Sequence, residues 1–518
     1  MKPVALVIMD GIGRGDGGPG DAVKLAKTPN LDKLLTEYPH TWLKAHGTAV
    51  GLPSDDDMGN SEVGHNALGC GQIYAQGAAL VNDRIATGAI YQSETWHMLV
   101  DNAKSGKTLH FLGLLSDGNV HSNIAHLLAL LTEAKKEGVE RVRVHILLDG
   151  RDVPATSALI YVDQLEKHLA SLGGDYKIAS GGGRMKITMD RYEADWGMVE
   201  LGWKTHVLGQ GRQFATAAEA IETLRAETGA IDQDLPPFVI AANGEPVGRI
   251  ENGDSVVLIN FRGDRALEIS KAFEYKDFDA FERPGYTGVV YAGMLQYDGD
   301  LHLPEHYLVA PPDIRHTLTE LLVEHDINEY ALSETQKYGH VTYFWNGNRS
   351  GKVSEKDETY VEIASDNVSF DQKPRMKADP ITDKFVAAMA SEKFQFLRCN
   401  FPNGDMVGHT GVLPAVIAAV EAVDEGLGQI MAAADKYGYT LCVTADHGNA
   451  DQMYDKNKKT GALSPRTAHS LNPVPFVVYD KSVRLKDGAF GLANVAGTVA
   501  QLLGIQAPDC WEEGMLAE

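Results

Sequence analysis

The chain begins with the stretch VALVIM at residues 4–9, six apolar residues in a row that are followed directly by Asp10. A strand with one exposed face would alternate apolar and polar residues, so a run without alternation indicates a strand buried on both faces. Similar runs recur at residues 109–115, 142–148, 256–260, 394–399 and 439–443. We therefore expect several buried strands of the kind that form parallel sheets.

Helical patterns separate several of these runs. Residues 124–137 form one such stretch, which ends before Gly138. In residues 414–437 apolar residues recur at helical spacing, Pro414 suits the first turn, and Gly438 suits the position after the last. Strands that alternate with helices predict an α/β fold with mainly parallel sheets flanked by helices.

Length and composition restrict the function. The 518 residues include 47 Lys and Arg against 71 Asp and Glu, a formal net charge of −24. This length favours two or more domains, and the acidic balance argues against a nucleic-acid binder. The four cysteines show no CxxC spacing, which argues against a zinc–thiolate site. No apolar run is long enough for a membrane span or a signal peptide, so we expect a cytoplasmic protein that does not bind membranes.

Carboxylates and imidazoles follow three of the predicted strands, and ligands of open α/β sheets bind beyond the carboxyl ends of the strands. Aspartate and histidine together suit Mn²⁺ or Zn²⁺ at a catalytic site. Six such ligands are too many for one catalytic ion, but they divide well between two ions about 3.5–4 Å apart. The candidate metal ligands are Asp10, Asp405, His409, Asp446, His447 and, one loop later, His469.

Ser61 lies between glycines in the segment MGNSEVGH, just before a helix-like stretch at residues 62–68. One interpretation is a helix N-cap, a position that serine often occupies. The other is a nucleophile whose hydroxyl is activated by a metal and whose acquired phosphate is stabilised by the helix N-terminus. The residue pattern by itself leaves both interpretations open.

A second set of polar residues follows the strands of the middle segment. Isolated arginines are usual on a solvated surface, but five of them at strand ends of an acidic protein suggest a pocket for a small anion. Arginine binds phosphate and carboxylate groups in a bidentate manner. The residues in question are Asp117, His121, Arg151, Asp152, Arg184, Arg191, Arg262 and Arg265.

Two short segments are candidate hinges, Gly77-Ala78-Ala79 and Ala310-Pro311-Pro312. If both connect domains, residues 77–309 form one domain that is inserted into another. The outer domain is then discontinuous and consists of residues 1–76 and 310–518.

These motifs, taken in order, resemble the cofactor-independent (2,3-bisphosphoglycerate-independent) phosphoglycerate mutases of the alkaline phosphatase superfamily. The resemblance rests on DGIG at Asp10, MGNSEVGH, LLDGRDVP, NFRGDR, SETQKYGHVTYFWNG, GDMVGH, TADHGN and the late His469. It extends from residue 4 to about residue 475, which is nearly the whole chain.

The resemblance implies an alkaline-phosphatase-like metal-binding core with an inserted phosphotransferase domain, and a monomer that interconverts 3-phosphoglycerate and 2-phosphoglycerate. It implies two divalent ions, Mn²⁺ in the first place, with Mg²⁺, Co²⁺ or Zn²⁺ as alternatives. One ion is bound by Asp405, His409 and His469, and the other by Asp10, Ser61, Asp446 and His447.

The resemblance also implies the roles of the remaining site residues. Ser61 carries the phosphoryl group, Lys337 stabilises charge near it, and Asp152 is the general acid and base. Arg262 and Arg265 bind the substrate phosphate, whereas Arg151, Arg184, Arg191 and His121 bind the carboxylate and hydroxyl groups.

Two rival functions differ from this expectation. A metal-dependent phosphomonoesterase or a sugar-phosphate mutase of the same superfamily would keep the metal ligands and the nucleophile but would not need Arg151-Asp152 and NFRGDR. A metal-stabilised binding protein without activity would be expected to have lost a ligand or the nucleophile, and all of them are present.

Overall fold

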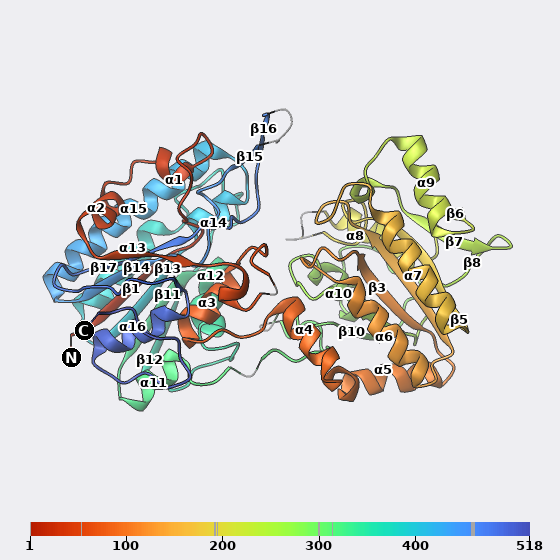
Figure 1. Ribbon diagram of the computed structural model, residues 1–518, viewed down its shortest axis with the longest axis horizontal. Coiled ribbons are helices and arrows are strands. Elements are labelled where there is room, and N and C mark those ends of the chain that lie inside the picture. Colours follow the sequence, from red (N-terminus) through yellow and green to blue (C-terminus); the bar gives the residue numbers. More distant parts are fainter. Residues whose placement is uncertain are drawn as a thin grey trace. The chain divides into compact units, whose positions relative to one another are not determined.

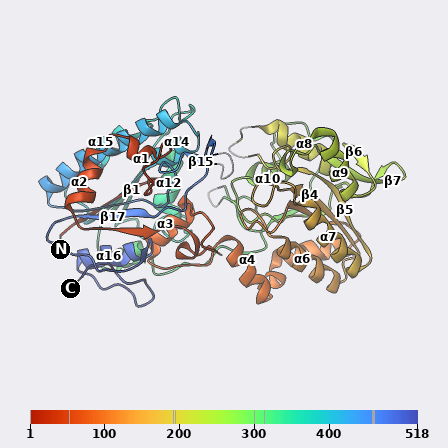
Figure 2. The same ribbon diagram turned by 45° about the horizontal axis from the view of Figure 1, so that its top comes forward.

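The computed structural model describes residues 2–52, 54–190, 193, 195–298, 301–312, 314–456 and 461–517. The chain divides into two compact units (Figures 1 and 2). The outer unit consists of Met1–Gln76 and Pro312–Glu518, and the inserted unit of Gly77–Pro311. Within the described residues, no helix is both long and apolar enough to cross a membrane.

The outer unit is built on an eight-stranded sheet in the order β12-β11-β13-β1-β14-β17-β2-β18. Its first five strands are parallel, β17 is antiparallel to both of its neighbours, and β18 is parallel to β2. The strands are β1 (Val4–Met9), β2 (His40–Lys44), β11 (Glu329–Glu334), β12 (Glu358–Ile363), β13 (Phe396–Phe401), β14 (Thr440–Thr444), β17 (Val474–Tyr479) and β18 (Phe490–Gly491), with a separate pair β15 (Tyr454–Lys456) and β16 (Leu463–Pro465).

Helices cover both faces of this sheet (Figure 1). Ala5, Val7 and Met9 of β1 pack against α2, α13 and α15, whereas Val4, Leu6 and Ile8 pack against α3, α11 and α16. Both faces are therefore buried, which explains why the run at residues 4–9 lacks polar residues. The helices are α1 (Ala22–Leu25), α2 (Pro29–Glu37), α3 (Ser61–Cys70), α11 (Leu318–Glu324), α12 (Thr335–Gly339), α13 (Ala378–Ala390), α14 (Asn403–Gly408), α15 (Leu413–Tyr437) and α16 (Asn494–Leu503), with the short turns η1 (Gly47–Val50) and η4 (His340–Phe344).

The inserted unit has a seven-stranded path, β10-β9-β3-β4-β5-β7-β6, whose first five strands are parallel; β7 runs antiparallel to β5, and β8 pairs with β7. The strands are β3 (Leu109–Leu115), β4 (Arg141–Leu148), β5 (Asp175–Gly183), β6 (Arg212–Phe214), β7 (Phe238–Ala242), β8 (Glu245–Pro246), β9 (Ser255–Leu258) and β10 (Val290–Gly293). The helices are α4 (Gly77–Ala86), α5 (Glu94–Lys104), α6 (Ile124–Lys136), α7 (Ala158–Leu172), α8 (Trp196–His206), α9 (Ala217–Thr228) and α10 (Leu267–Glu274), with η2 (Ala89–Gln92) and η3 (Asp232–Asp234).

The predicted α/β fold with mainly parallel sheets is confirmed, and each of the six apolar runs overlaps a strand. The strand expected at residues 394–399 is shifted to Phe396–Phe401. Apolar character does not mark where a backbone pairs: Asn400 is polar, yet its backbone continues the ladder beside Ile8 of β1.

Candidate active site

The central strands of the outer sheet deliver the predicted metal ligands to one edge. Strands β13, β1 and β14 are neighbours and parallel, so their carboxyl ends meet. Asp10 follows β1, and Asp446 and His447 follow β14. Asp405 lies on the short helix α14 after β13, and His409 follows one turn later, which places both side chains on the same face of the helix.

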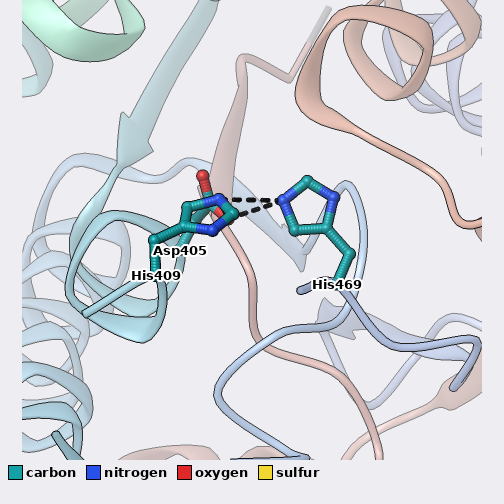
Figure 3. Close-up of side chains that lie close together, drawn as sticks. All are labelled: Asp405, His409 and His469. Carbon is teal, nitrogen blue, oxygen red and sulfur yellow. Dashed lines mark hydrogen bonds and ion pairs between the residues drawn. The ribbon is translucent and has the colours of Figure 1, made fainter. Parts of the chain in front are cut away.

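Asp405, His409 and His469 form the first group of possible metal ligands (Figure 3). Asp405 Oδ1 lies 3.1 Å from His409 Nε2 and 3.0 Å from His469 Nε2. The two Nε2 atoms are 3.1 Å apart. Three potential donor atoms therefore converge on one point.

Backbone carbonyls fix the tautomers of these histidines. His409 Nδ1 donates to the carbonyl of Thr467 at 2.7 Å, and His469 Nδ1 donates to that of Gly59 at 2.7 Å. A carbonyl only accepts, so in the neutral ring the lone pair lies on Nε2, as in most histidine metal sites. Burial, together with the charge of His447, lowers the pKa of His469 to about 3, so this ring is neutral at physiological pH.

Asp10, Asp446 and His447 form the second group, and all three side chains are fully buried. His447 Nε2 lies 3.4 Å from Asp10 Oδ1 and 3.7 Å from Asp446 Oδ2, while its Nδ1 donates to the carbonyl of Gly448 at 3.2 Å. Burial and the nearby Asp446 raise the pKa of Asp10 to about 6. The crowding of negative charge thus costs free energy in the absence of further cations.

These observations fit two divalent cations. In the first group, lone pairs of two imidazoles face each other at 3.1 Å, and a cation between them would turn this repulsion into coordination. In the second, Asp446 Oδ2 is buried and accepts no hydrogen bond from the described residues. Mixed nitrogen and oxygen donors of this kind suit Mn²⁺, Co²⁺ and Zn²⁺.

Ser61 is the first residue of α3 and lies against the second group. Its hydroxyl is 3.2 Å from Asp10 Oδ1 and 3.0 Å from His447 Nε2. The N-cap of this helix is Asn60, whose side chain accepts from the backbone N–H of Val63 at 3.0 Å. The N-cap interpretation of Ser61 is therefore wrong, because the cap is one residue earlier, and the Ser61 hydroxyl is directed to the acidic residues instead.

Lys337, on α12, extends its ammonium group into the same place. Its Nζ donates to the hydroxyl of Ser61, lies 2.8 Å from Asp405 Oδ2, and lies 3.2 Å from Asp10 Oδ1. Burial alone would lower the pKa of this lysine, but the surrounding carboxylates, Asp10 first, hold the pKa well above its usual value. Lys337 is thus a fixed positive charge that contacts the Ser61 hydroxyl and one carboxylate of each group.

In the inserted unit, the residues after β4 and β5 form a buried acid–base cluster. Arg184 is 1% exposed, and its Nη1 donates to Asp149 Oδ1 at 2.9 Å and to Asp152 Oδ2. Asp149 also accepts the backbone N–H groups of Arg151 and Asp152 at 3.1 and 3.0 Å. Burial raises the pKa of Asp152 and Asp149 adds to the rise, whereas Arg184 opposes it.

Further predicted residues gather around His121. Burial holds the pKa of His121 well below its usual value, and the charges of Arg184, Arg262 and Arg265 contribute to the shift. Asp264 lies 3.6 Å from His121 Nδ1 and 3.1 Å from Arg262 Nε. Tyr161 donates to Asp117 at 2.5 Å. Arg191 lies outside the described residues.

Several residues at these sites are absent from the sequence prediction. Asn400 Nδ2 donates to Asp10 Oδ2 at 2.8 Å, and Asn449 Nδ2 donates to Asp405 Oδ1 at 2.9 Å, so these amides orient carboxylates. Asp149 carried a signal, because it follows an apolar run as directly as Asp10 does. Asn400 carried none, since it is a polar residue within a strand.

The α/β sheet and its ligand-bearing edge define a metalloenzyme, and the sequence matches the metalloenzyme superfamily over residues 2–507. Particular relatives are much closer. The chain is 52% identical over 533 residues to the "Probable 2,3-bisphosphoglycerate-independent phosphoglycerate mutase" of Leptospira interrogans serogroup Icterohaemorrhagiae (serovar Lai), with 99% of this chain and 97% of the relative covered. It is 50% identical over 535 residues to the 2,3-bisphosphoglycerate-independent phosphoglycerate mutase of Trypanosoma brucei brucei, with the same coverage.

A solved structure agrees. Phosphoglycerate mutase of Leishmania mexicana, crystallised at low cobalt concentration, superposes with a TM-score of 0.80 at 48% identity, covering 100% of this chain and 98% of the other. The chain belongs to the family of 2,3-bisphosphoglycerate-independent phosphoglycerate mutases. The resemblance inferred from the motifs is thereby confirmed.

Proposed function

We propose that the protein interconverts 3-phosphoglycerate and 2-phosphoglycerate without 2,3-bisphosphoglycerate, through a phosphoserine at Ser61. The observation that carries the proposal is the position of the Ser61 hydroxyl, in contact with Asp10 and His447 of one group and with Lys337, which also contacts Asp405 of the other. The family of the chain supports the same substrate pair.

Asp405, His409 and His469 would hold one divalent ion, and Asp10, Asp446 and His447 with Ser61 the other. When bound, two ions lower the pKa of the serine hydroxyl and offset the charge of the phosphoryl group. We propose Mn²⁺, for which these mixed donors are suitable, with Mg²⁺, Co²⁺ and Zn²⁺ as alternatives.

The chain's own residues then perform two symmetrical transfers. Before the first transfer the Ser61 hydroxyl gives its proton to solvent. The ionised Ser61 Oγ then bonds to phosphorus as the bond from phosphorus to the C3 oxygen breaks, and protonated Asp152 gives its proton to that oxygen. In the second, the Asp152 carboxylate takes the proton of the C2 hydroxyl, whose oxygen bonds to phosphorus as the bond to Ser61 breaks. Lys337 is placed to stabilise negative charge at Ser61 in both steps.

The properties of Asp152 suit a group that both gives and takes a proton. Its pKa is raised by burial, which brings the protonated and ionised forms closer in free energy at neutral pH. Arg184 donates to it and fixes its orientation. We assign Arg262 and Arg265 to the substrate phosphate, and Arg151, Arg184, Arg191 and His121 to the carboxylate and hydroxyl groups.

The test is to incubate the purified protein with 3-phosphoglycerate and Mn²⁺, without 2,3-bisphosphoglycerate, and to measure 2-phosphoglycerate and inorganic phosphate separately. We expect 2-phosphoglycerate, and we expect Ser61→Ala or a chelator to abolish its formation. Inorganic phosphate as the main product would identify a phosphomonoesterase instead. Ser61→Ala that retains conversion would refute the phosphoserine.

A further inference from the structure

A line of buried polar side chains crosses the sheet of the inserted unit from strand to strand. The line begins next to β9, passes through strands β3 and β4, and reaches β5, the last residue of α8 and the loop after β5. Each residue is at most 4% exposed. We call these residues the polar chain: Asp254, His110, His145, Ser180, His206 and Thr188.

Hydrogen bonds connect all six residues in sequence. Asp254 Oδ2 lies 3.0 Å from His110 Nε2, and His110 Nδ1 lies 2.9 Å from His145 Nε2. Ser180 Oγ is 2.7 Å from both His145 Nδ1 and His206 Nδ1. The last link joins His206 Nε2 to Thr188 Oγ1 at 3.1 Å.

The direction of these hydrogen bonds is fixed by Asp254. Its carboxylate accepts the backbone N–H groups of Thr108 and Glu251, both at 2.9 Å, and therefore also accepts from His110 Nε2. A neutral ring that donates at one nitrogen accepts at the other. Burial lowers the pKa of all three histidines, that of His206 to about 3, so the rings are neutral.

Each residue then donates toward Asp254. His145 donates to His110, Ser180 to His145, His206 to Ser180, and the hydroxyl of Thr188 to His206. The hydrogen bonds therefore hold the hydroxyl of Thr188, a loop residue at the opposite end of the polar chain from Asp254.

Thr188 has a backbone conformation that needs such support. Its φ is +70°, in the left-handed region that β-branched residues rarely adopt. Its N–H donates to the carbonyl of Met198 at 3.0 Å, and α8 approaches it closely at Gly202, where an added Cβ would lie 2.2 Å from Thr188 Oγ1. The absence of a side chain at Gly202 leaves room for the hydroxyl to reach His206.

The residue next to Thr188 contacts a proposed substrate arginine. The carbonyl of Met189 accepts from Arg265 Nη1 at 2.8 Å. Arg184, four residues before Thr188, begins the same loop. A displacement of Thr188 would therefore move the carbonyl that orients the Arg265 guanidinium.

We propose that the polar chain is a positioning device for substrate binding: it anchors Thr188, and through Met189 it holds Arg265 in the orientation that binds the substrate anion. This proposal rests on the proposed function, in which Arg265 contacts the phosphate. None of the six residues is among those that we assign to the substrate, so we class them as positioning residues. A network that served stability alone would change the melting temperature of a variant without changing its substrate affinity.

The test compares Thr188→Val, which has nearly the shape of threonine but no hydroxyl, with Thr188→Ser, which keeps the hydroxyl. We expect Thr188→Val to raise the KM for 3-phosphoglycerate about tenfold, as expected for one misaligned hydrogen bond to a charged group, with kcat nearly unchanged. Thr188→Ser is expected to stay within about threefold of the unsubstituted protein. An unchanged KM in Thr188→Val, or equal changes in both variants, would overturn the proposal.

A second measurement needs no substitution. The ¹⁵N chemical shifts of the histidine rings distinguish the tautomers, and we expect Nε2–H for His110 and His145 and Nδ1–H for His206. The opposite tautomer at His206 would overturn the proposal even if a valine variant failed to fold. If the unsubstituted protein forms no 2-phosphoglycerate, the proposed function fails by itself, and the calorimetric Kd of 3-phosphoglycerate for the two variants then replaces KM.

Discussion

Arg398 and Glu329 form a salt bridge that is completely inaccessible to solvent in the outer sheet. Arg398 Nη1 lies 2.7 Å from Glu329 Oε2, and neither side chain is exposed. Arg398 Nε donates to the carbonyl of Val341 at 2.9 Å, and its guanidinium lies 4.6 Å from the centre of the Trp345 ring. Arg398 thus supports the π-helical turn that follows Lys337.

We expect Arg398→Met to destabilise the protein strongly. Methionine fills similar space but leaves the carboxylate of Glu329 buried without its cation, and removal of one partner of such a pair costs about 3–5 kcal/mol. For a unit of this size, about 2 °C per kcal/mol is expected, which gives a fall of about 6–10 °C in Tm.

The loss of stability in Arg398→Met should be larger at high pH than at low pH. Burial raises the pKa of Glu329 more than Arg398 lowers it, so the loss of Arg398 raises the pKa further. A carboxyl group whose pKa is higher in the folded state than in the unfolded state favours folding at low pH, and this contribution is lost as the pH rises through the folded-state pKa. The deficit of Arg398→Met should therefore be smaller at pH 5 than at pH 8.

Urea unfolding at pH 5, 6, 7 and 8, followed by circular dichroism, measures the deficit. The matched control is the double variant Arg398→Met with Glu329→Gln, which removes the stranded charge and keeps an acceptor for the hydroxyl of Thr319, 3.0 Å from Glu329 Oε1. We expect this control to recover most of the pH-dependent part of the decrease in the free energy of unfolding. A deficit below about 1 kcal/mol, or one that is the same at every pH, would refute the reasoning.

Three further expectations follow from individual contacts. Gly408→Ala would place a Cβ 2.5 Å from Asn449 Oδ1 and displace the amide that orients Asp405. We therefore expect the affinity for metal at the Asp405 group to fall about tenfold in a calorimetric titration. Two ions bound with unchanged affinity would contradict this expectation. Burial raises the pKa of Glu268 to about 7, and its Oε2 has no hydrogen-bond partner among the described residues, so ionised Glu268 destabilises the fold above that pH. We expect Glu268→Gln to be more stable than the unsubstituted protein by about 1–2 kcal/mol at pH 8 but not at pH 5. Equal stability of the two proteins at pH 8 would count against this expectation. His447 must be neutral to coordinate the ion that we propose for it, and its acidic neighbours, Asp446 first, raise its pKa above the usual value of about 6.5. Activity and bound metal should therefore decline together as the pH falls from 8 to 5, and an activity profile flat down to pH 5 would oppose metal ligation by this ring.

The sequence was sufficient to predict the strands and the residues at their ends. A strand buried on both faces is mostly apolar, and this property is local, so VALVIM and its counterparts could be recognised directly. Asp10 follows its run directly, and Asp446 follows its run after two residues. The parallel pairing of β1 with β14 then brings the two aspartates together. Residues that reach the site from a strand end could therefore be identified without coordinates.

Residues that reach the site from other elements could not be identified from the sequence pattern. Lys337 lies in a segment without a distinctive local pattern, and only the resemblance to a family singled it out. Its place beside Ser61 depends on contacts between α12 and residues far away in the sequence. The pairing of Asn60 with Val63, one residue from the expected cap, is local but falls within the usual uncertainty of a helix boundary.

The least predictable residues are polar ones inside apolar strands, and the structure gives a reason to look for them. His110, His145 and Arg398 all lie within runs that indicate buried strands. A polar group there must find its partners on neighbouring strands, because an unsatisfied one costs about 1–3 kcal/mol. Both networks end under a loop or turn near a proposed site residue. One ends at Thr188, whose neighbour Met189 contacts Arg265, and the other at Val341, four residues after Lys337. A core made only of apolar residues would avoid that cost but would hold the loops through packing alone, without directional bonds. Polar residues inside apolar strands are therefore the first candidates for positioning residues in this fold.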